Sequence, residues 1–213
     1  MNRLPSQERV LGHYLAVQHP PLLPEVALWL VAGHVDLEAR CQELLEGGRA
    51  PYWAFCWGSG QALARHLLDH PQLVAGQRVV DFGAGSGVAG IAAARAGAAT
   101  VTAVDTDDAA RRFARLNAGL NGVSLEVTDT LPLGWDVMLA SDVLYEPALA
   151  NWLQGHARTG RTLYVSDPLR PGNARLDAEP LAWIDDARTF PDVDPPMHRA
   201  ALYRLGPIRG ESP

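Results

Sequence analysis

The 213-residue sequence has few cysteines, no long apolar run and no excess of basic residues. Its two cysteines, Cys41 and Cys56, cannot build a disulfide framework, which argues against a disulfide-stabilised secreted protein. No apolar run approaches the roughly 18 residues that a membrane-spanning helix needs, and the N-terminus lacks the apolar core of a signal peptide. We therefore expect a soluble, cytoplasmic protein that has no membrane segment.

Lysine is absent, so all 18 basic residues are arginine, and 24 acidic residues leave a formal net charge of −6. This sign of charge disfavours a protein that gains its affinity from phosphate backbones, and we expect no nucleic-acid partner. A biased codon composition explains the missing lysine most simply. The length allows one α/β domain plus an extension, and the 47% of apolar residues are enough to form a sizeable core.

Residues 1–57 differ in pattern from the rest and are predicted to form an N-terminal helical cap. Apolar spacing predicts one helix over residues 6–17 and a second over residues 36–45, each with a plausible cap or stop signal. Residues 25–30 between them fit either a strand or a helix. The segment is too small to fold alone, so we expect it to pack on the rest of the chain.

Residues 58–207 alternate between short apolar strands and helices, and residues 208–213 are predicted to be a flexible tail. Strands are predicted at residues 78–82, 100–104, 125–128, 137–140, 162–165 and 198–205, and helices at residues 61–70, 88–96, 108–116, 147–156 and 175–184. This alternation indicates an α/β fold with a Rossmann-like, doubly wound and mostly parallel sheet. Ligands of such sheets bind at the carboxyl ends of the strands.

The first predicted strand ends in a glycine-rich turn, Asp-Phe-Gly-Ala-Gly-Ser-Gly over residues 81–87, and the second ends at Asp105. Such a turn with a downstream acid fits either a dinucleotide or S-adenosylmethionine. The dinucleotide fingerprint G-x-G-x-x-G matches residues 85–90, so pattern alone does not decide. Charge decides between the two cofactors, because a pyrophosphate over the turn would be repelled by Asp81, whereas the ammonium of S-adenosylmethionine would be attracted. Asp105 can accept hydrogen bonds from ribose hydroxyls of either cofactor.

We therefore predict S-adenosylmethionine as the cofactor, with S-adenosylhomocysteine as the product, and expect no metal. An NAD(P)-dependent oxidoreductase is the alternative from another enzyme class, although the chain is short for its second nucleotide-binding half and its substrate domain. A cofactor-binding module without catalytic activity is a further alternative.

The glycine turn and Asp105 resemble the first two motifs of the class I, seven-stranded S-adenosylmethionine-dependent methyltransferases. Four segments more narrowly resemble the electron-transfer-flavoprotein β-subunit lysine methyltransferase group: residues 19–25 (HPPLLPE), 51–65 (PYWAFCWGSGQALAR), 81–87 (DFGAGSG) and 141–146 (SDVLYE). The resemblance implies a seven-stranded sheet, a helix beside the first strand, a reversed last strand and Trp57 near the cofactor. This chain departs from the group at Ser141, where glycine is usual, and at residues 167–170, Asp-Pro-Leu-Arg instead of Asp-Pro-Gly-Arg.

The resemblance also implies a protein-lysine N-methyltransferase, in which Asp142 and Tyr145 face the acceptor amine as the catalytic residues. Asp142 is the candidate to orient the amine, and Tyr145 to supply an aromatic wall or a hydroxyl. The predicted cofactor contacts are Trp57, Asp81, Gly83, Ala84, Gly85, Gly87, Asp105, Thr106, Asp129 and Ser141. The predicted substrate contacts are Glu25, Trp57 and Asp167.

Structural roles remain open for several of these residues: a helix cap for Asp142, a turn cap for Asp129, and core packing for Trp57 and Tyr145. The enzyme is expected to be a monomer. Its expected partner is a protein substrate that is similar to the electron-transfer-flavoprotein β subunit and bears an accessible lysine. A small-molecule amine, or another N-methylation substrate on the same fold, is the alternative. The missing lysine would also prevent an enzyme of this kind from methylating itself.

Overall fold

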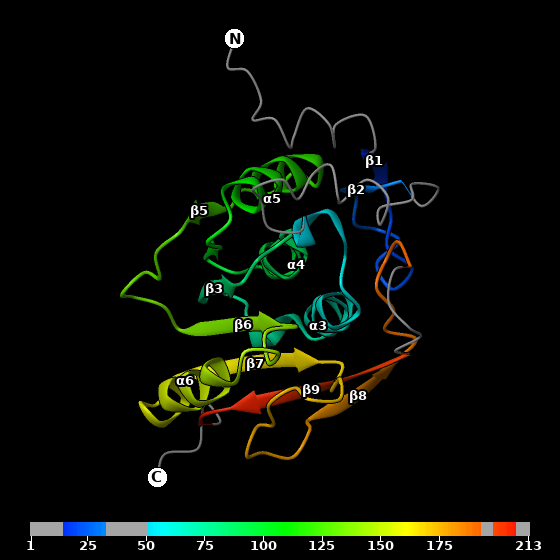
Figure 1. Ribbon diagram of the computed structural model, residues 1–213. Helices are drawn as coiled ribbons and strands as arrows, with labels where there is room; N and C mark the ends of the chain where they lie inside the picture. Colours follow the sequence, from blue (N-terminus) through cyan, green and yellow to red (C-terminus); the bar gives the residue numbers. More distant parts are fainter. Residues whose placement is uncertain (1–14, 33–50, 193–197, 208–213) are drawn as a thin grey trace.

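The centre of the protein is a seven-stranded sheet, seen in the computed structural model, which describes residues 15–32, 51–192 and 198–207 (Figure 1). The strands are β1 (Leu15–Gln18), β2 (Leu28–Val31), β3 (Arg78–Phe82), β4 (Thr100–Val104), β5 (Glu126–Thr128), β6 (Val137–Ser141), β7 (Thr162–Asp167), β8 (Ala182–Asp185) and β9 (Arg199–Leu205). The helices are η1 (Tyr52–Ala54), α3 (Gly58–Asp69), η2 (Pro71–Leu73), α4 (Val88–Arg95), α5 (Asp108–Leu120) and α6 (Pro147–Arg158). None of these helices is long and apolar enough to cross a membrane.

The strand order of the large sheet is β5-β4-β3-β6-β7-β9-β8. The first five strands of this order pair in parallel, and β9 runs antiparallel to both of its neighbours. Chain order reverses direction between β3 and β6, which is where a doubly wound sheet places its ligand crevice. The predicted α/β fold with a reversed last strand is confirmed.

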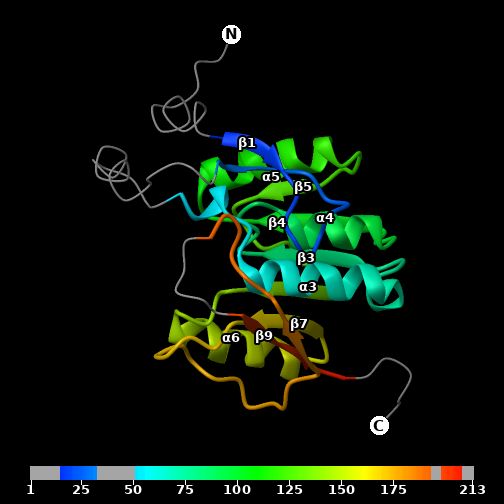
Figure 2. The same ribbon diagram turned by 90° about the vertical axis from the view of Figure 1, so that its right-hand side faces the viewer.

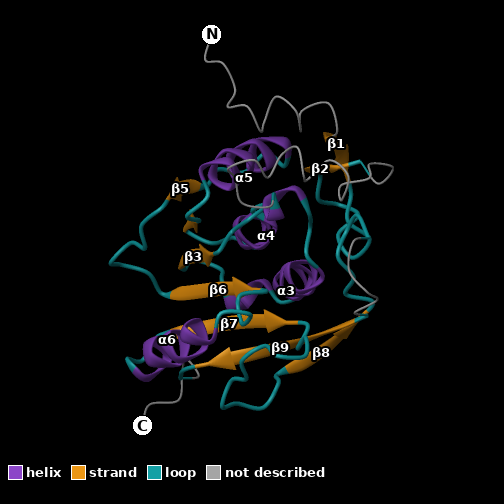
Figure 3. Cartoon of the chain, viewed as in Figure 1, coloured by secondary structure: helices purple, strands orange, loops and turns teal. Residues whose placement is uncertain are grey.

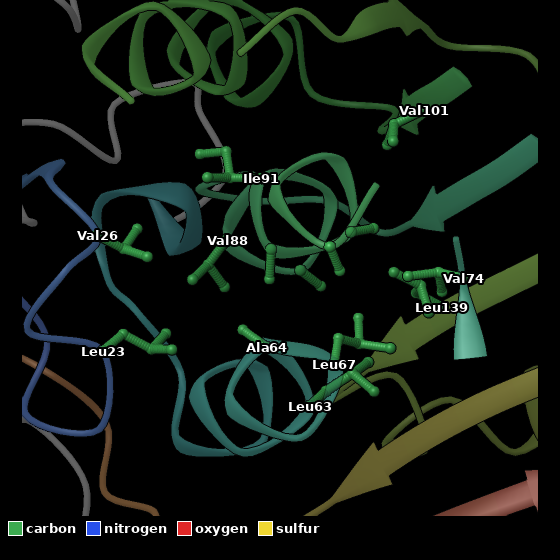
Figure 4. Close-up of a cluster of buried hydrophobic side chains, with 14 of the residues drawn as sticks. Leu23, Val26, Leu63, Ala64, Leu67, Val74, Val88, Ile91, Val101 and Leu139 are labelled. Carbon is green, nitrogen blue, oxygen red and sulfur yellow. The ribbon is translucent and has the colours of Figure 1, made fainter. Parts of the chain in front are cut away.

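Alternate side chains of each central strand enter separate cores on the two faces of the sheet, as the two-residue period of a strand requires. Val79 and Leu139 belong to the core under α3 and α4, whereas Val80 and Met138 belong to the core under α6. Figure 1 shows these helices on opposite sides of the sheet, and Figure 4 shows the first core at close range. These strands are apolar at successive positions because both of their faces are covered.

The N-terminal segment contains a β-hairpin where a helix was predicted. Residues 15–18 form β1, which pairs antiparallel with β2, so the predicted helix over residues 6–17 is wrong for its last three residues. The hairpin lies against α5 (Figure 2), and Leu23 and Leu28 are fully buried in the core under α3 and α4. The rest of this predicted helix and the predicted helix at residues 36–45 lie outside the described residues. The domain boundary at residue 57 stays a prediction.

Residues 175–184 are not helical, contrary to the sequence-based prediction. Residues 168–181 form loop and turn, and β8 follows as the edge strand of the sheet (Figure 3). Edge position explains the weak apolar pattern: Trp183 and Asp185 point to solvent while only alternate residues pack inward.

Asn117 on α5 ties the hairpin to the glycine turn, although the sequence offered no sign of this role. Its Oδ1 accepts a hydrogen bond from the Trp29 backbone N–H at 2.8 Å, and its Nδ2 donates to the Ser86 carbonyl at 2.8 Å. Asn117 has no exposed surface. The position of the glycine turn is therefore coupled to the packing of the N-terminal segment.

Candidate active site

A cavity of about 920 Å³ lies at the carboxyl ends of β3, β4 and β6. Its size is at the upper end of the range of about 300–1,000 Å³ that is usual for small-molecule sites. The described residues that line it are Tyr52, Trp53, Trp57, Phe82, Gly83, Gly85, Val104, Asp105, Thr106, Asp107, Ala110, Asp129, Leu131, Ser141, Asp142, Val143, Tyr145, Leu149 and Arg170.

The glycine turn after β3 holds one side of this cavity in a conformation that other residues resist. Gly85 has a φ of 52°, and its N–H donates a hydrogen bond to Asp105 Oδ2 at 2.9 Å. Gly87 has a φ of 80° at the start of α4, and a Cβ there would lie 3.1 Å from the Cβ of Ala114. Both positions therefore favour glycine, Gly85 for its positive φ and Gly87 for its positive φ and the packing of α4 on α5.

Asp105 follows β4 and is fixed by the backbone around it. Besides the bond from Gly85, its Oδ1 accepts the Asp107 N–H at 2.9 Å, and its carbonyl accepts Arg111 Nη1 at 2.7 Å. A carboxylate has about four acceptor positions, so the two bonds from Gly85 and Asp107 leave the Asp105 carboxylate with capacity for the hydroxyls of a ligand.

Asp142 and Tyr145 follow β6 and line the same cavity. Asp142 has a φ of 55°, a left-handed conformation that aspartate tolerates better than most residues, and its N–H donates to the Ser166 carbonyl at 3.0 Å. Its side chain is only 9% exposed and forms an ion pair with Arg170. Asp142 does not cap α6, because the N-cap of that helix is Glu146.

Aromatic side chains line the cavity together with Asp142. Trp57 donates its indole N–H to the Tyr52 carbonyl at 2.9 Å, and the guanidinium carbon of Arg170 lies 5.5 Å from the centre of its ring. Trp53 stacks on Phe113 of α5 with ring centres 4.1 Å apart. Tyr145 is 68% exposed at the mouth; burial, then the charges of Asp142 and Asp105, raise its pKa, so its hydroxyl stays protonated at neutral pH.

The charge of the cavity favours a cationic ligand. Among the described lining residues four are carboxylates, Asp105, Asp107, Asp129 and Asp142, and one is a guanidinium, Arg170. S-adenosylmethionine carries a sulfonium and an ammonium, which this lining suits, whereas the pyrophosphate of a dinucleotide would be repelled. The volume, the glycine turn and the acceptor capacity of Asp105 also fit this group.

Known proteins are similar to this chain over the part that forms the sheet and the cavity. Residues 61–155 match a family model described as ribosomal protein L11 methyltransferase (PrmA). The chain is also 38% identical over 185 residues to the electron transfer flavoprotein beta subunit lysine methyltransferase of Xenopus laevis, a match that covers 81% of this chain and 72% of the relative. The chain belongs to the electron transfer flavoprotein beta subunit lysine methyltransferase family. It is an S-adenosylmethionine-dependent methyltransferase.

Other relatives of the methyltransferase match over shorter stretches. The Danio rerio protein of the same name is 41% identical over 131 residues, covering 56% of this chain and 51% of that protein, so the chain spans about half the length of this relative. Among solved structures, the Pyrococcus abyssi tRNA (uracil-54, C5)-methyltransferase in complex with S-adenosyl-L-homocysteine is 22% identical, with a TM-score of 0.49, and the match covers 67% of this chain and 38% of that one.

Most predicted site residues of the methyltransferase lie together in the cavity. Those that line it are Trp57, Gly83, Gly85, Asp105, Thr106, Asp129, Ser141, Asp142 and Tyr145. Ala84 and Gly87 do not line it and instead shape the turn. The lining residues that sequence reasoning missed include Tyr52, Trp53, Asp107 and Arg170. Two of these four, Tyr52 and Trp53, lie inside a segment that resembles the methyltransferase group, and Arg170 lies in the segment where this chain departs from the group.

The predicted direct contact between Asp81 and the cofactor is not what the structure shows. Asp81 is 2% exposed, is not among the described lining residues, and its Oδ2 accepts the Gly90 N–H at 2.8 Å. Burial raises its pKa from 3.8 to about 7, with Asp105 adding to the rise and the bond from Gly90 opposing it. Asp81 therefore joins β3 to α4 behind the turn, and the negative charge that faces the cavity comes from other residues.

The raised pKa of Asp81 predicts a pH-dependent stability. The folded state keeps this proton up to about pH 7, whereas the unfolded chain releases it near pH 4, so stability falls as the pH rises through this window. Between about pH 5 and 8, we expect the wild type to lose about 2–3 kcal/mol of unfolding free energy relative to Asp81→Asn. Denaturant unfolding of both proteins at the two pH values measures this difference. Equal pH slopes would contradict the prediction.

Two predicted substrate contacts lie elsewhere. Glu25 pairs with Arg65 at 2.6 Å, its carbonyl accepts Arg95 Nη1 at 2.7 Å, and it is not among the described residues of the cavity. Asp167 is completely buried at the end of β7, where its Oδ1 accepts the Leu169 N–H at 2.7 Å. Glu25 therefore fastens the N-terminal segment to α3 and α4, and Asp167 shapes the loop after β7.

Proposed function

We propose that this methyltransferase transfers a methyl group to a lysine side chain of a protein acceptor similar to the β subunit of electron transfer flavoprotein. The observation that carries the proposal is the position of Asp142: a mostly buried carboxylate at the end of β6, which lines the same cavity as Trp57. A carboxylate and an aromatic face are the two groups that bind an ammonium or amine best.

A lysine amine must lose a proton before it can attack, because its reference pKa is about 10.4. Asp142 supports this step by accepting a hydrogen bond from the amine and directing its lone pair inward. An anion alone favours the charged ammonium, so removal from water by the aromatic wall must favour the neutral amine. Trp57 and Tyr145 supply that wall, and the released proton passes to solvent at the open mouth.

Asp105 would hold the ribose hydroxyls, Asp129 the adenine amino group, and the glycine turn would lie along the cofactor. When bound, S-adenosylmethionine supplies a methyl group on a positively charged sulfur, which leaves as a neutral thioether while the acceptor nitrogen takes the methyl. The chain's own part is mainly to align the amine and to exclude water from its surroundings.

The mouth of the cavity supports a macromolecular acceptor. Tyr52 is 62% and Tyr145 is 68% exposed there, so the acceptor group enters between side chains that a protein surface can contact. The proposal keeps the sequence-based predictions of a monomeric, cytoplasmic enzyme that does not act on nucleic acid, and the four carboxylates of the cavity support the last of these.

Labelling tests the proposal directly. The purified enzyme is incubated with S-adenosylmethionine carrying a labelled methyl group, together with a cell lysate and, separately, with purified β subunit of electron transfer flavoprotein. We expect label on a protein band, located on lysine by peptide mapping, and none with Asp142→Asn. Label confined to small molecules or nucleic acid would overturn the proposal in favour of another acceptor on the same fold.

A further inference from the structure

Arg170 lies between two groups of the proposed acceptor site. Its Nη1 donates to Asp142 Oδ1, and its guanidinium lies over the ring of Trp57, 5.5 Å from the ring centre. The side chain is 27% exposed, so it is partly removed from water at the edge of the cavity. A planar guanidinium can make both contacts at once, one through its edge and one through its face.

The loop that carries Arg170 is built to hold it in place. Asp167 at the end of β7 accepts the Leu169 N–H at 2.7 Å and Asn173 Nδ2 at 3.3 Å, and Leu169 has a φ of 57°. A leucine in this left-handed conformation is strained, so the surrounding bonds must maintain it. The buried carboxylate of Asp167 thereby fixes the direction in which the next residues leave the sheet.

Backbone bonds join this loop to the loop of Asp142. The Asp142 N–H donates to the Ser166 carbonyl at 3.0 Å, and the Ala174 N–H donates to the Leu144 carbonyl at 2.9 Å. The ion pair between Arg170 and Asp142 therefore joins two loops whose backbones are already hydrogen-bonded to each other. It restricts the rotation of the Asp142 carboxylate.

We propose that Arg170 is a positioning residue, which holds the Asp142 carboxylate in the orientation that receives the acceptor lysine. This inference rests on the proposed function. Arg170, on the loop after β7, donates to one oxygen of the Asp142 carboxylate. A carboxylate can accept further hydrogen bonds through its other acceptor positions. Its charge also offsets part of the negative charge of the cavity, which lessens the preference for a charged ammonium over the neutral amine.

Turnover of Arg170→Ala tests this role, with methyl transfer to the acceptor measured at saturating concentrations. We expect kcat to fall by up to about 100-fold, the cost of misplacing a reacting group by about an ångström. The dissociation constant of S-adenosylhomocysteine, measured by calorimetry, should stay unchanged. Added methylguanidinium should restore part of kcat, because it can occupy the same two contacts; a merely structural role would show no such rescue.

Arg199→Ala is the matched control. Arg199, the first residue of β9, also pairs with a carboxylate, Asp185 at 3.2 Å, and lies over an indole, 4.2 Å from the ring centre of Trp183. Both partners are on the edge strand β8, and Arg199 is not among the described residues that line the cavity. This variant should keep the wild-type kcat. Wild-type kcat in Arg170→Ala, or a fall in kcat that accompanies an equal loss of S-adenosylhomocysteine binding, would overturn the inference.

R170K gives a second readout, which also serves if Arg170→Ala does not fold. Because the natural chain has no lysine, methyl-lysine at position 170 is easily detected by peptide mapping. We expect partial activity and no methylation there, since the side chain should stay paired with Asp142. Methylation at position 170 would show that this side chain reaches the acceptor position and would overturn the inference. Failure of the wild type to methylate any lysine would instead defeat the proposed function.

Discussion

Substitution of Asp142 by asparagine is expected to lower kcat by about 10²–10⁴-fold, the usual contribution of a positioned proton acceptor, without weakening S-adenosylhomocysteine binding. Asparagine keeps the shape of the side chain but removes the charge that orients the amine. It also tolerates the φ of 55° at this position, whereas alanine would add backbone strain that confuses the result. Steady-state turnover together with calorimetric binding separates the chemical defect from a loss of cofactor affinity.

Glu146→Gln is the control for Asp142→Asn. Glu146 lies four residues further on the same loop, is exposed, and is not among the described residues that line the cavity. Its neutralisation should leave turnover nearly unchanged. If Asp142→Asn kept its activity, or if both variants lost activity alike, Asp142 would have no specific role in receiving the acceptor, and the proposed chemistry would need another residue.

Chain order predicts that several residues at strand ends meet in one cavity. Gly85, Asp105 and Asp142 each follow an apolar run, and in a parallel sheet the ends of neighbouring strands meet at one edge. Their convergence could therefore be predicted without knowing any side-chain contact. The same holds for the sheet itself, since its parallel strands are buried on both faces and read as continuous apolar runs.

The errors at Glu25, Asp81 and Asp167 share another cause. Each is a carboxylate in a motif of the resembled family, but its partner is decided by packing: Arg65 lies 40 residues from Glu25, and Gly90 meets Asp81 only because α4 lies against β3. Position in a motif does not tell whether a carboxylate faces the cavity or the protein interior. Burial decides this, and burial follows from the assembled fold.

The misread elements are short and lie at edges. Within the part of the chain that the structure describes, the four-residue β1 pairs only with β2, and β8 forms the outer edge of the large sheet. Neither therefore shows the apolar run of a central strand. Helical spacing of a few apolar residues then matched these segments by chance. Tertiary pairing outweighed the local pattern in both cases.

Replacement of Asp105 by alanine should give the largest loss of cofactor affinity. Hydrogen bonds to a charged group contribute about 1.5–3 kcal/mol, so loss of the ribose contact should raise the dissociation constant of S-adenosylhomocysteine about 10- to 100-fold. The substitution also frees the N–H groups of Gly85 and Asp107, which loosens the glycine turn itself. Calorimetric titration measures the change, and kcat at saturating cofactor should fall much less than for Asp142→Asn.

Asp136→Asn separates this effect from a general loss of negative charge. Asp136 lies at the amino end of β6, opposite the cavity, and pairs with Arg78 at 3.1 Å. Removing its charge should leave the affinity for S-adenosylhomocysteine unchanged, because this partly exposed charge is balanced by Arg78 and is screened from the opposite end of the strands. An equal loss of affinity in both variants would mean that net charge, rather than the acceptor geometry of Asp105, holds the cofactor. Retained affinity in Asp105→Ala would mean that the carboxylate serves only the glycine turn.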